Sequence, residues 1–397
     1  MHLRAHFLEL QSLLIRYTDV WRPAPFHVSQ PAWCARWPEL AAALDALDEH
    51  TVERFAADPD LCITWLTSHL PALVGLAELC RIPALPAREL IAAEAHFDDG
   101  IPGRKRAQIE AFTRHIPPVT TPVLEWCAGK AHLGRRVAHA DRVQVTSLEI
   151  NASLCADAAM LAARRGTNQR ILCADALDET SRTHVRGRAV LALHACGELH
   201  RTLVRSATHD GAEAYRIAPC CYHLGTDGHY RPLSQDAHLP LDTSALRLAV
   251  TETVTAPRHD RVRLGRDQAW KLGFIALRNA LEGDTPRPFR PVPASWHSDG
   301  FEGFCRRLAT REQVVLPADV SWSDWEAVGW ARRDRMRRLE LVRHAFRRPL
   351  ELWLVLDLAL GLHERGFDVQ VGRFCERALT PRNLLVLADR RGIVTQP

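Results

Sequence analysis

The chain has 397 residues, 47% of them hydrophobic and 25% charged, which is the composition of an ordinary globular protein. Its formal net charge is only +4 at pH 7, too small to indicate nucleic-acid binding by itself. Eleven scattered cysteines, no apolar run of 18 residues and no signal-like N-terminus argue against a disulfide framework, a membrane span and export, so we expect a cytoplasmic protein with reduced thiols.

The first hundred residues are predicted to form a helical N-terminal domain. Leucines recur at helical spacing in 7–14 and 40–47, and no strand-like alternation is visible. A hinge is expected at Gly100-Ile-Pro-Gly103. The next helix carries the basic triplet 104–106 and stops at Pro117-Pro118, as helices do before proline.

The rest of the chain is organised around residues 123–134, which read V-L-E-W-C-A-G-K-A-H-L-G. An apolar run, a loop of small residues and a helix follow one another, so that backbone N–H groups and a helix N-terminus are aimed at a ligand. The usual Gly-rich fingerprint has three glycines. Here Cys127 and Ala131 occupy two of these places and only Gly129 remains, so an ordinary strand-to-helix turn stays an open alternative.

Two further apolar runs also end in an acid, and together the three acids favour S-adenosylmethionine (SAM) as the ligand. Glu149 comes 20 residues after Gly129, where such folds place the acid that binds the ribose hydroxyls, and Asp175 closes the third run. We expect Glu125 near the methionine end, Glu149 at the ribose and Asp175 facing the adenine amino group. The predicted cofactor-binding residues are Glu125, Cys127, Ala128, Gly129, Ala131, His132, Glu149, Asp175, Ala176 and His194.

Residues 101–224 are predicted to be an α/β core. Strands are expected at 122–127, 144–150, 170–174, 188–194 and 214–219, with helices between them, of which 152–165 is the clearest. Apolar strands alternating with helices predict a parallel sheet covered on both faces. The fold class is therefore α/β, and with SAM as the ligand we expect a Rossmann-like class I methyltransferase sheet of seven strands.

Strands four and five deliver His194-Ala-Cys196 and Cys220-Cys221-Tyr222-His223 to the edge where parallel sheets bind ligands. His194 and His223 are candidate general bases, Tyr222 a candidate for orienting the acceptor, and Cys220 a candidate nucleophile. These side chains are also of the types that bind zinc. Because their arrangement, H-x-C and C-C-x-H, is not a usual zinc spacing, no metal is assigned, and a metal or redox site stays an alternative.

Residues 225–347 are expected to be a mainly helical, basic insertion after strand five. Eight arginines lie in 331–348, against the two acids Asp334 and Glu340. This stretch is a candidate RNA-binding stripe, with a solvated helix face as the alternative. Residues 348–397 would then complete the core with its last helix and strands six and seven, the last of them antiparallel.

At this point the chain resembles a family of SAM-dependent methyltransferases. E-W-C-A-G-K-A-H-L-G, A-L-H-A-C-G-E-L and A-P-C-C-Y-H look like its motifs, over at least 104–224. The family includes the methyltransferase domain of the glutathione S-transferase C-terminal domain-containing protein and proteins related to ribosomal RNA adenine dimethylases, and is similar to a tRNA 2′-O-methyltransferase. The resemblance implies SAM as cofactor but no particular substrate. The chain departs from the motif at Ala131, where glycine is more usual, and a methyl group there would crowd the cofactor loop.

The leading hypothesis is a SAM-dependent methyltransferase, with RNA favoured as acceptor over protein or a small molecule. A second hypothesis is a non-catalytic RNA- or protein-binding module on a methyltransferase scaffold. The Cys/His metal or redox site is the third. No membrane association is expected, and oligomeric state is not addressed by the sequence.

Overall fold

The computed structural model describes residues 3–93, 96–251, 258–283, 287 and 289–392. Two compact units make up the chain. The first comprises residues 1–15, 78–252 and 347–397, and the second comprises 16–77 and 253–346. The domain boundaries predicted from the sequence differ from these units and stay a prediction. They divide the chain into 1–100, 101–224, 225–347 and 348–397.

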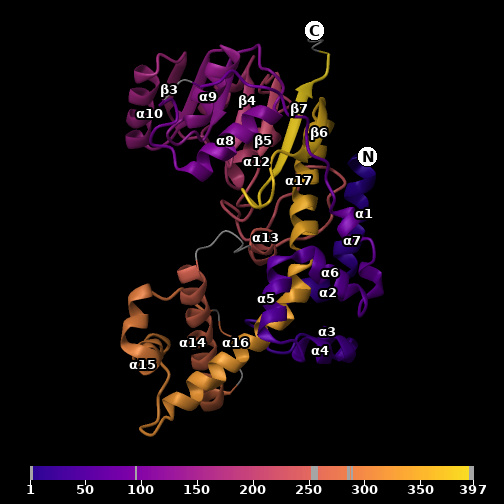
Figure 1. The fold of residues 1–397 in the computed structure, drawn as a ribbon, viewed down its shortest axis with the longest axis vertical. Helices are drawn as coiled ribbons and strands as arrows, with labels where there is room; N and C mark the ends of the chain where they lie inside the picture. The colour runs from indigo at the N-terminus through magenta and orange to yellow at the C-terminus, as the bar shows by residue number, and fades with distance from the viewer. Residues whose placement is uncertain (1–2, 94–95, 252–257, 284–286, 288, 393–397) are drawn as a thin grey trace. The chain divides into compact units, whose positions relative to one another are not determined.

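The first unit is built on one seven-stranded sheet. Its strands are β1 (Val123–Trp126), β2 (Val145–Glu149), β3 (Gln169–Cys173), β4 (Ala189–Leu193), β5 (Ala214–Ala218), β6 (Phe367–Arg373) and β7 (Leu384–Arg390). They lie in the order β3-β2-β1-β4-β5-β7-β6, with β3 and β6 at the edges (Figure 1). Strands β1 to β5 are parallel, and β7 is antiparallel to both β5 and β6. The predicted class I methyltransferase sheet is confirmed.

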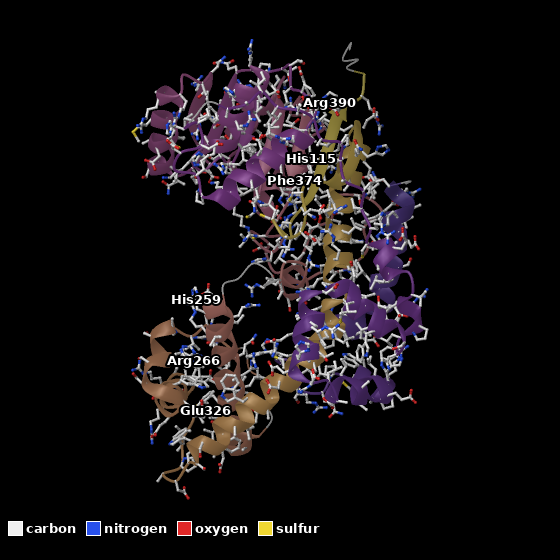
Figure 2. The ribbon with its side chains drawn as sticks, in the orientation of Figure 1. His115, His259, Arg266, Glu326, Phe374 and Arg390 are labelled. Carbon is white, nitrogen blue, oxygen red and sulfur yellow. The ribbon has the colours of Figure 1, made fainter. Side chains whose placement is uncertain are left out.

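Helices cover this sheet because its central strands are apolar on both faces: every residue of β1 and of β5 is buried. The covering helices include α8 (Gly103–His115), α9 (His132–Asp141), α10 (Ala152–Arg164), α12 (Glu198–Ser206) and α17 (Arg347–Glu364). Helix α8 packs on α9, and α12 packs on α17. Phe374, labelled in Figure 2, meets Phe112 of α8 edge to face with ring centroids 6.0 Å apart, inside the main core.

A buried carboxylate on α17 fixes the segment that follows β5. Asp357 is fully buried, and it accepts hydrogen bonds from Tyr230 Oη (2.7 Å), Leu233 N (2.9 Å), Ser234 N (2.9 Å) and Ser234 Oγ (2.6 Å). These bonds satisfy the carboxylate in the interior, which is the condition for burying one. The remaining elements assigned mainly to this unit are α1 (Leu3–Arg16), α7 (Leu76–Leu79), α11 (Glu179–Arg182), η2 (Thr183–Val185) and α13 (Thr243–Leu248). Residues 246–253 read from the sequence as a helix. Helix α13 begins earlier and ends earlier, and residues 252–253 lie outside the described residues.

The second unit is helical throughout its described elements. These are α2 (Thr18–Trp21), α3 (Trp33–Arg36), α4 (Pro38–Asp45), α5 (Glu49–Ala57), α6 (Pro59–Thr67), η1 (Pro71–Leu73), α14 (Arg258–Glu282), η3 (Ala294–Asp299), α15 (Gly300–Glu312) and α16 (Trp322–His344). Helix α14 packs closely on α16 because glycines meet at the crossing. A Cβ at Gly273 would lie 2.8 Å from the carbonyl oxygen of Trp325, and one at Gly329 would collide with that of Ala269.

An aromatic cluster forms the core between α14 and α15. Trp270 stacks on His297, donates its Nε1–H to Glu326 (2.7 Å), and carries the Arg266 guanidinium over its ring (Figure 2). The helical character predicted for the N-terminal region and for the insertion is confirmed for the described residues.

Candidate cofactor and acceptor site

The loop between β1 and α9 has the backbone path of a Gly-rich loop but only one of its glycines. Cys127 (φ +58°), Gly129 (φ +59°) and Ala131 (φ +53°) all adopt the left-handed conformation. That conformation costs a residue with a Cβ roughly 1–2 kcal/mol, which is why glycine is usual there. Ala131 is only 1% exposed, so its methyl group packs against protein atoms. Ala131 thus carries backbone strain, and the expected crowding of the loop against the cofactor stays a prediction.

Glu149, at the end of β2, holds this loop in place. One carboxylate oxygen accepts a hydrogen bond from Gly129 N (2.8 Å), and the other accepts from Asn151 N (3.0 Å). Ala128 N donates to the carbonyl oxygen of Leu148 (2.8 Å). Each carboxylate oxygen retains a lone pair for a further donor, so Glu149 can bind the loop and ligand hydroxyls together.

Asp175, which closes β3 in sequence, is the second half-buried acid at this edge. It caps its own turn by accepting from Leu177 N (2.9 Å), and the neighbouring Ala176 is buried. Burial, together with the negative charges of Glu149, Cys196, Asp175 and Glu125, raises the pKa of the Cys127 thiol to about 12. The three acids predicted to bind the cofactor, Glu125, Glu149 and Asp175, therefore all lie near Cys127 in the loop.

Glu125 lies deeper than the other two acids. It is 3% exposed and accepts a hydrogen bond from Ser147 Oγ (2.6 Å), and the backbone N–H of Gly134 also bonds to it. Burial raises its pKa to about 7 in spite of these bonds and of the nearby Lys105 and Arg135 charges. A Cβ at Gly134 would collide with its carboxylate, so glycine is required there. Glu125 thus anchors the first turn of α9 through its hydrogen bond with the backbone of Gly134.

His132 begins α9 and is buried against the same loop. Arg135 Nη2 donates to its Nδ1 (3.0 Å). Burial, together with the charges of Arg135, Lys105 and Lys130, lowers the pKa of His132 to about 4. The imidazole is therefore neutral near pH 7, and it offers no positive charge to a ligand.

His194 stands at the end of β4 in the left-handed conformation (φ +61°). Its Nε2–H donates to Gln108 Oε1 of α8 (3.2 Å), which leaves Nδ1 to accept a proton. Burial lowers the pKa of His194 to about 4, followed by the charges of Arg382, Lys105 and Arg104. Sequence reasoning missed Gln108 and Arg382 as parts of this site. Two sequence features could have indicated them: the basic triplet on α8, near Gln108, and the T-P-R-N run before β7, which contains Arg382.

Three cysteine sulfurs meet beside His194. Cys196 Sγ and Cys220 Sγ are 3.1 Å apart, and Cys221 Sγ lies within 4.8 Å of both. The hydrogen bond from the Cys220 thiol lowers the pKa of Cys196 to about 6, and the same bond raises the pKa of Cys220. The predicted convergence of strands four and five is thus observed for these thiols.

Tyr222 and His223 are placed differently from the cysteines. Tyr222 is 2% exposed, and its hydroxyl has no hydrogen-bond partner among the described residues. His223 is half-buried, and burial followed by the Arg247 charge lowers its pKa. Neither ring joins the sulfur cluster found within the described residues. Their catalytic roles, like those of His194 and Cys220, stay predictions.

The arginines of 331–348 are engaged within their own units. Arg335 and Arg337 pair with Asp45 and Glu49, and Arg338 donates to the carbonyl oxygen of Leu47. Further partners are Asp334 for Arg333, Trp21 O for Arg343, Thr251 O for Arg347 and Glu351 for Arg348. These side chains help to hold α16 and α17, so RNA contact through this stretch stays a prediction.

Comparison with known proteins identifies a methyltransferase domain. Residues 104–226 match a family model described as "Methyltransferase domain". No curated protein matches the chain. Among the described residues, no helix is long and apolar enough to cross a membrane.

Three solved structures are similar to parts of the chain. The N-terminal domain of EvdMO1 with S-adenosylhomocysteine (SAH) bound is 20% identical over 40% of this chain and 71% of that one, with a TM-score of 0.24. A putative caffeoyl-CoA O-methyltransferase from Staphylococcus aureus is 10% identical over 82% and 95%, with a TM-score of 0.27. Coclaurine N-methyltransferase bound to N-methylheliamine and SAH is 13% identical over 79% and 94%, with a TM-score of 0.26. The fold assignment rests on the strand order of the chain itself.

Proposed function

We propose that this chain, which carries a SAM-dependent methyltransferase domain, transfers the methyl group of SAM to RNA. The observation that carries the cofactor assignment is the loop held by the Gly129 N to Glu149 bond, with Asp175 at the end of the next strand. At the carboxyl edge of a parallel sheet this arrangement suits an adenosine: Glu149 would accept from the ribose hydroxyls and Asp175 from the adenine amino group.

The residues present fit the cofactor. A Cβ at Gly129 would have open space around it, so the backbone there is accessible to a ligand. Glu149 and Asp175 are half-buried, which leaves room for a partner and strengthens the hydrogen bonds that they accept. SAM supplies an already activated methyl group on its sulfonium, so the work of the protein is to hold and align the acceptor.

His194 is the residue best placed to take a proton from the acceptor. Its ring is oriented by Gln108, and its Nδ1 is free to accept a proton in the tautomer that this bond selects. The strained backbone at His194 holds the ring at the end of β4, at the edge that carries the cofactor loop.

Positive charges around this edge support an anionic acceptor. Arg382, Lys105 and Arg104 all lie close enough to His194 to lower its pKa. Arg104 also donates to the carbonyl oxygen of Leu379, and Arg382 pairs with Glu351. Lys105, exposed on α8, is therefore the charge of this rim that is best placed to attract a polyphosphate backbone. The motif resemblance to ribosomal RNA adenine dimethylase-related proteins supports the same acceptor class. The arginines of 331–348 contribute little to the proposal, because they already have partners within the protein.

The test is methyl transfer from labelled SAM to separated RNA, protein and small-molecule fractions of a cell extract. We expect label in RNA, and we expect His194→Asn to lower kcat by roughly 10²–10⁴-fold, the usual contribution of a general base. Label confined to protein or to small molecules would refute the RNA proposal. A chain that binds SAM and RNA but transfers no methyl group would favour the non-catalytic module.

The basic rim has its own test with a matched control. Lys105→Ala should raise the KM for RNA with little change in kcat, because it removes a charge that attracts the acceptor. Arg164→Ala removes one positive charge from an exposed position on α10 and should leave the KM unchanged. Equal effects of the two variants would contradict a local basic rim.

A further inference from the structure

The three cysteines beside His194 come from adjacent parallel strands. Leu193 of β4 pairs with Ala218 of β5, so the residues just beyond, Cys196 on one strand and Cys220 and Cys221 on the other, face the same space. Their sulfurs lie within 4.8 Å of one another, and the shortest separation is 3.1 Å. Three thiolates around a tetrahedral zinc ion, with Zn–S bonds of about 2.3 Å, are separated by about 3.8 Å. The three sulfurs are gathered at about this scale, and Cys196 and Cys220, which are closer than this, would move apart to bind the ion.

The backbone beside the sulfurs is held in a costly conformation at His194. His194 is left-handed (φ +61°), and its carbonyl oxygen lies 3.3 Å from Cys196 Sγ and 3.4 Å from Cys220 Sγ. Gly197 has a positive φ (+55°), which glycine adopts without strain, and a Cβ there would collide with the carbonyl oxygen of Leu224. Strain of this kind persists where a function depends on the geometry. Simple packing of three thiols would not require it.

We propose that Cys196, Cys220 and Cys221 bind one zinc ion, with the fourth coordination position open to water or to an acceptor atom. Thiolates are soft ligands that select zinc over magnesium or calcium. Cys220 is buried, while Cys196 and Cys221 are half-buried, so an ion can enter from the solvent side. Three protein ligands with one open position are the pattern of catalytic rather than structural zinc sites.

Charge balance also suits this assignment. Three thiolates and one zinc ion carry a single net negative charge, and Arg382 lies close enough to Cys221 to act on it electrostatically. No histidine belongs to the ligand group found among the described residues. His194 and His223 therefore remain available for proton transfer. The proposal does not depend on SAM binding, since the ligands are side chains outside the cofactor loop.

The test is the metal content of the full-length chain, purified under reducing conditions without added metal. We expect about one zinc per chain by elemental analysis, the count for a single site. We expect zinc to be lost in Cys196→Ser and in Cys221→Ser. Cys173→Ser removes an exposed thiol outside the cluster and should keep the zinc. Far-UV circular dichroism would verify that each variant is folded.

A second measurement keeps the proposal falsifiable if a variant fails to fold. Cobalt(II) added to the metal-free parent should give thiolate-to-cobalt charge-transfer absorption that saturates at about one equivalent, because a single site is filled. A folded parent that contains no zinc and shows no such band would overturn the proposal. So would equal zinc content in the parent and the cluster variants, or a Cys196 to Cys220 disulfide in the protein purified without reductant and no metal uptake after reduction.

Discussion

Glu125 makes the stability of the chain depend on pH, and Glu125→Gln should remove this dependence. The carboxyl is 3% exposed, and burial raises its pKa from 4.5 to about 7. A raised pKa means that the folded state favours the protonated form. The contribution to stability is therefore fully present below pH 4.5 and is lost as the pH rises to 7. A shift of about 2.5 units corresponds to about 3 kcal/mol.

Urea unfolding followed by circular dichroism at several pH values between 4.5 and 8 measures the effect. The free energy of unfolding of the variant, minus that of the parent, should rise by about 3 kcal/mol over this interval. The amide introduced by Glu125→Gln keeps one oxygen for the Ser147 hydroxyl, so the two proteins should differ less at the acidic end. Glu179→Gln, at a position 92% exposed, is the matched control for losing one carboxylate. A difference that is flat with pH, or that falls, would refute the reasoning.

Three further substitutions test the packing. Ala131→Gly should raise the free energy of unfolding by about 1 kcal/mol, because it relieves a left-handed alanine, and an unchanged urea midpoint would contradict this. Gly329→Ala should lower the melting temperature and cost about 1–3 kcal/mol, since its methyl group would collide with the α14 backbone; calorimetry of the full chain would show it. Asp357→Ala leaves four buried donors without their acceptor and should cost about 3 kcal/mol or more in urea unfolding, while Asp368→Ala, on the exposed face of β6, should cost little.

Much of the fold follows from the sequence because the sheet is buried on both faces. The five parallel strands were predicted to within one residue at either end, since each is a short apolar run between polar residues. The C-terminal strands were also predicted, with β7 antiparallel. Helix ends in the insertion are less predictable. The sequence pattern indicates a helix over 268–281, whereas α14 begins ten residues before Gln268, in a stretch rich in charged residues.

Three features of the structure could not be predicted from the sequence: the loop conformation, the burial of Glu125 and the pairing of the arginines in 331–348. Residue preferences reserve left-handed positions for glycine, so the conformations of Cys127 and Ala131 could not be predicted from their side chains. The burial of Glu125 depends on Gly134, nine residues away, and on the neighbouring strand. Counting charges suggested a free basic stripe in 331–348, but the acids that pair with Arg335 and Arg337 lie nearly three hundred residues earlier, at Asp45 and Glu49.

Cofactor binding is tested most directly by calorimetric titration of the purified chain with SAM and with SAH, repeated on Glu149→Ala and Asp175→Ala. We expect the parent to bind both ligands. Loss of a hydrogen bond to a charged group, worth about 1.5–3 kcal/mol, should weaken binding about 10- to 150-fold in each variant. A folded parent that takes up neither ligand, or variants that bind as tightly as the parent, would contradict the assignment of the loop and its two acids as the SAM site.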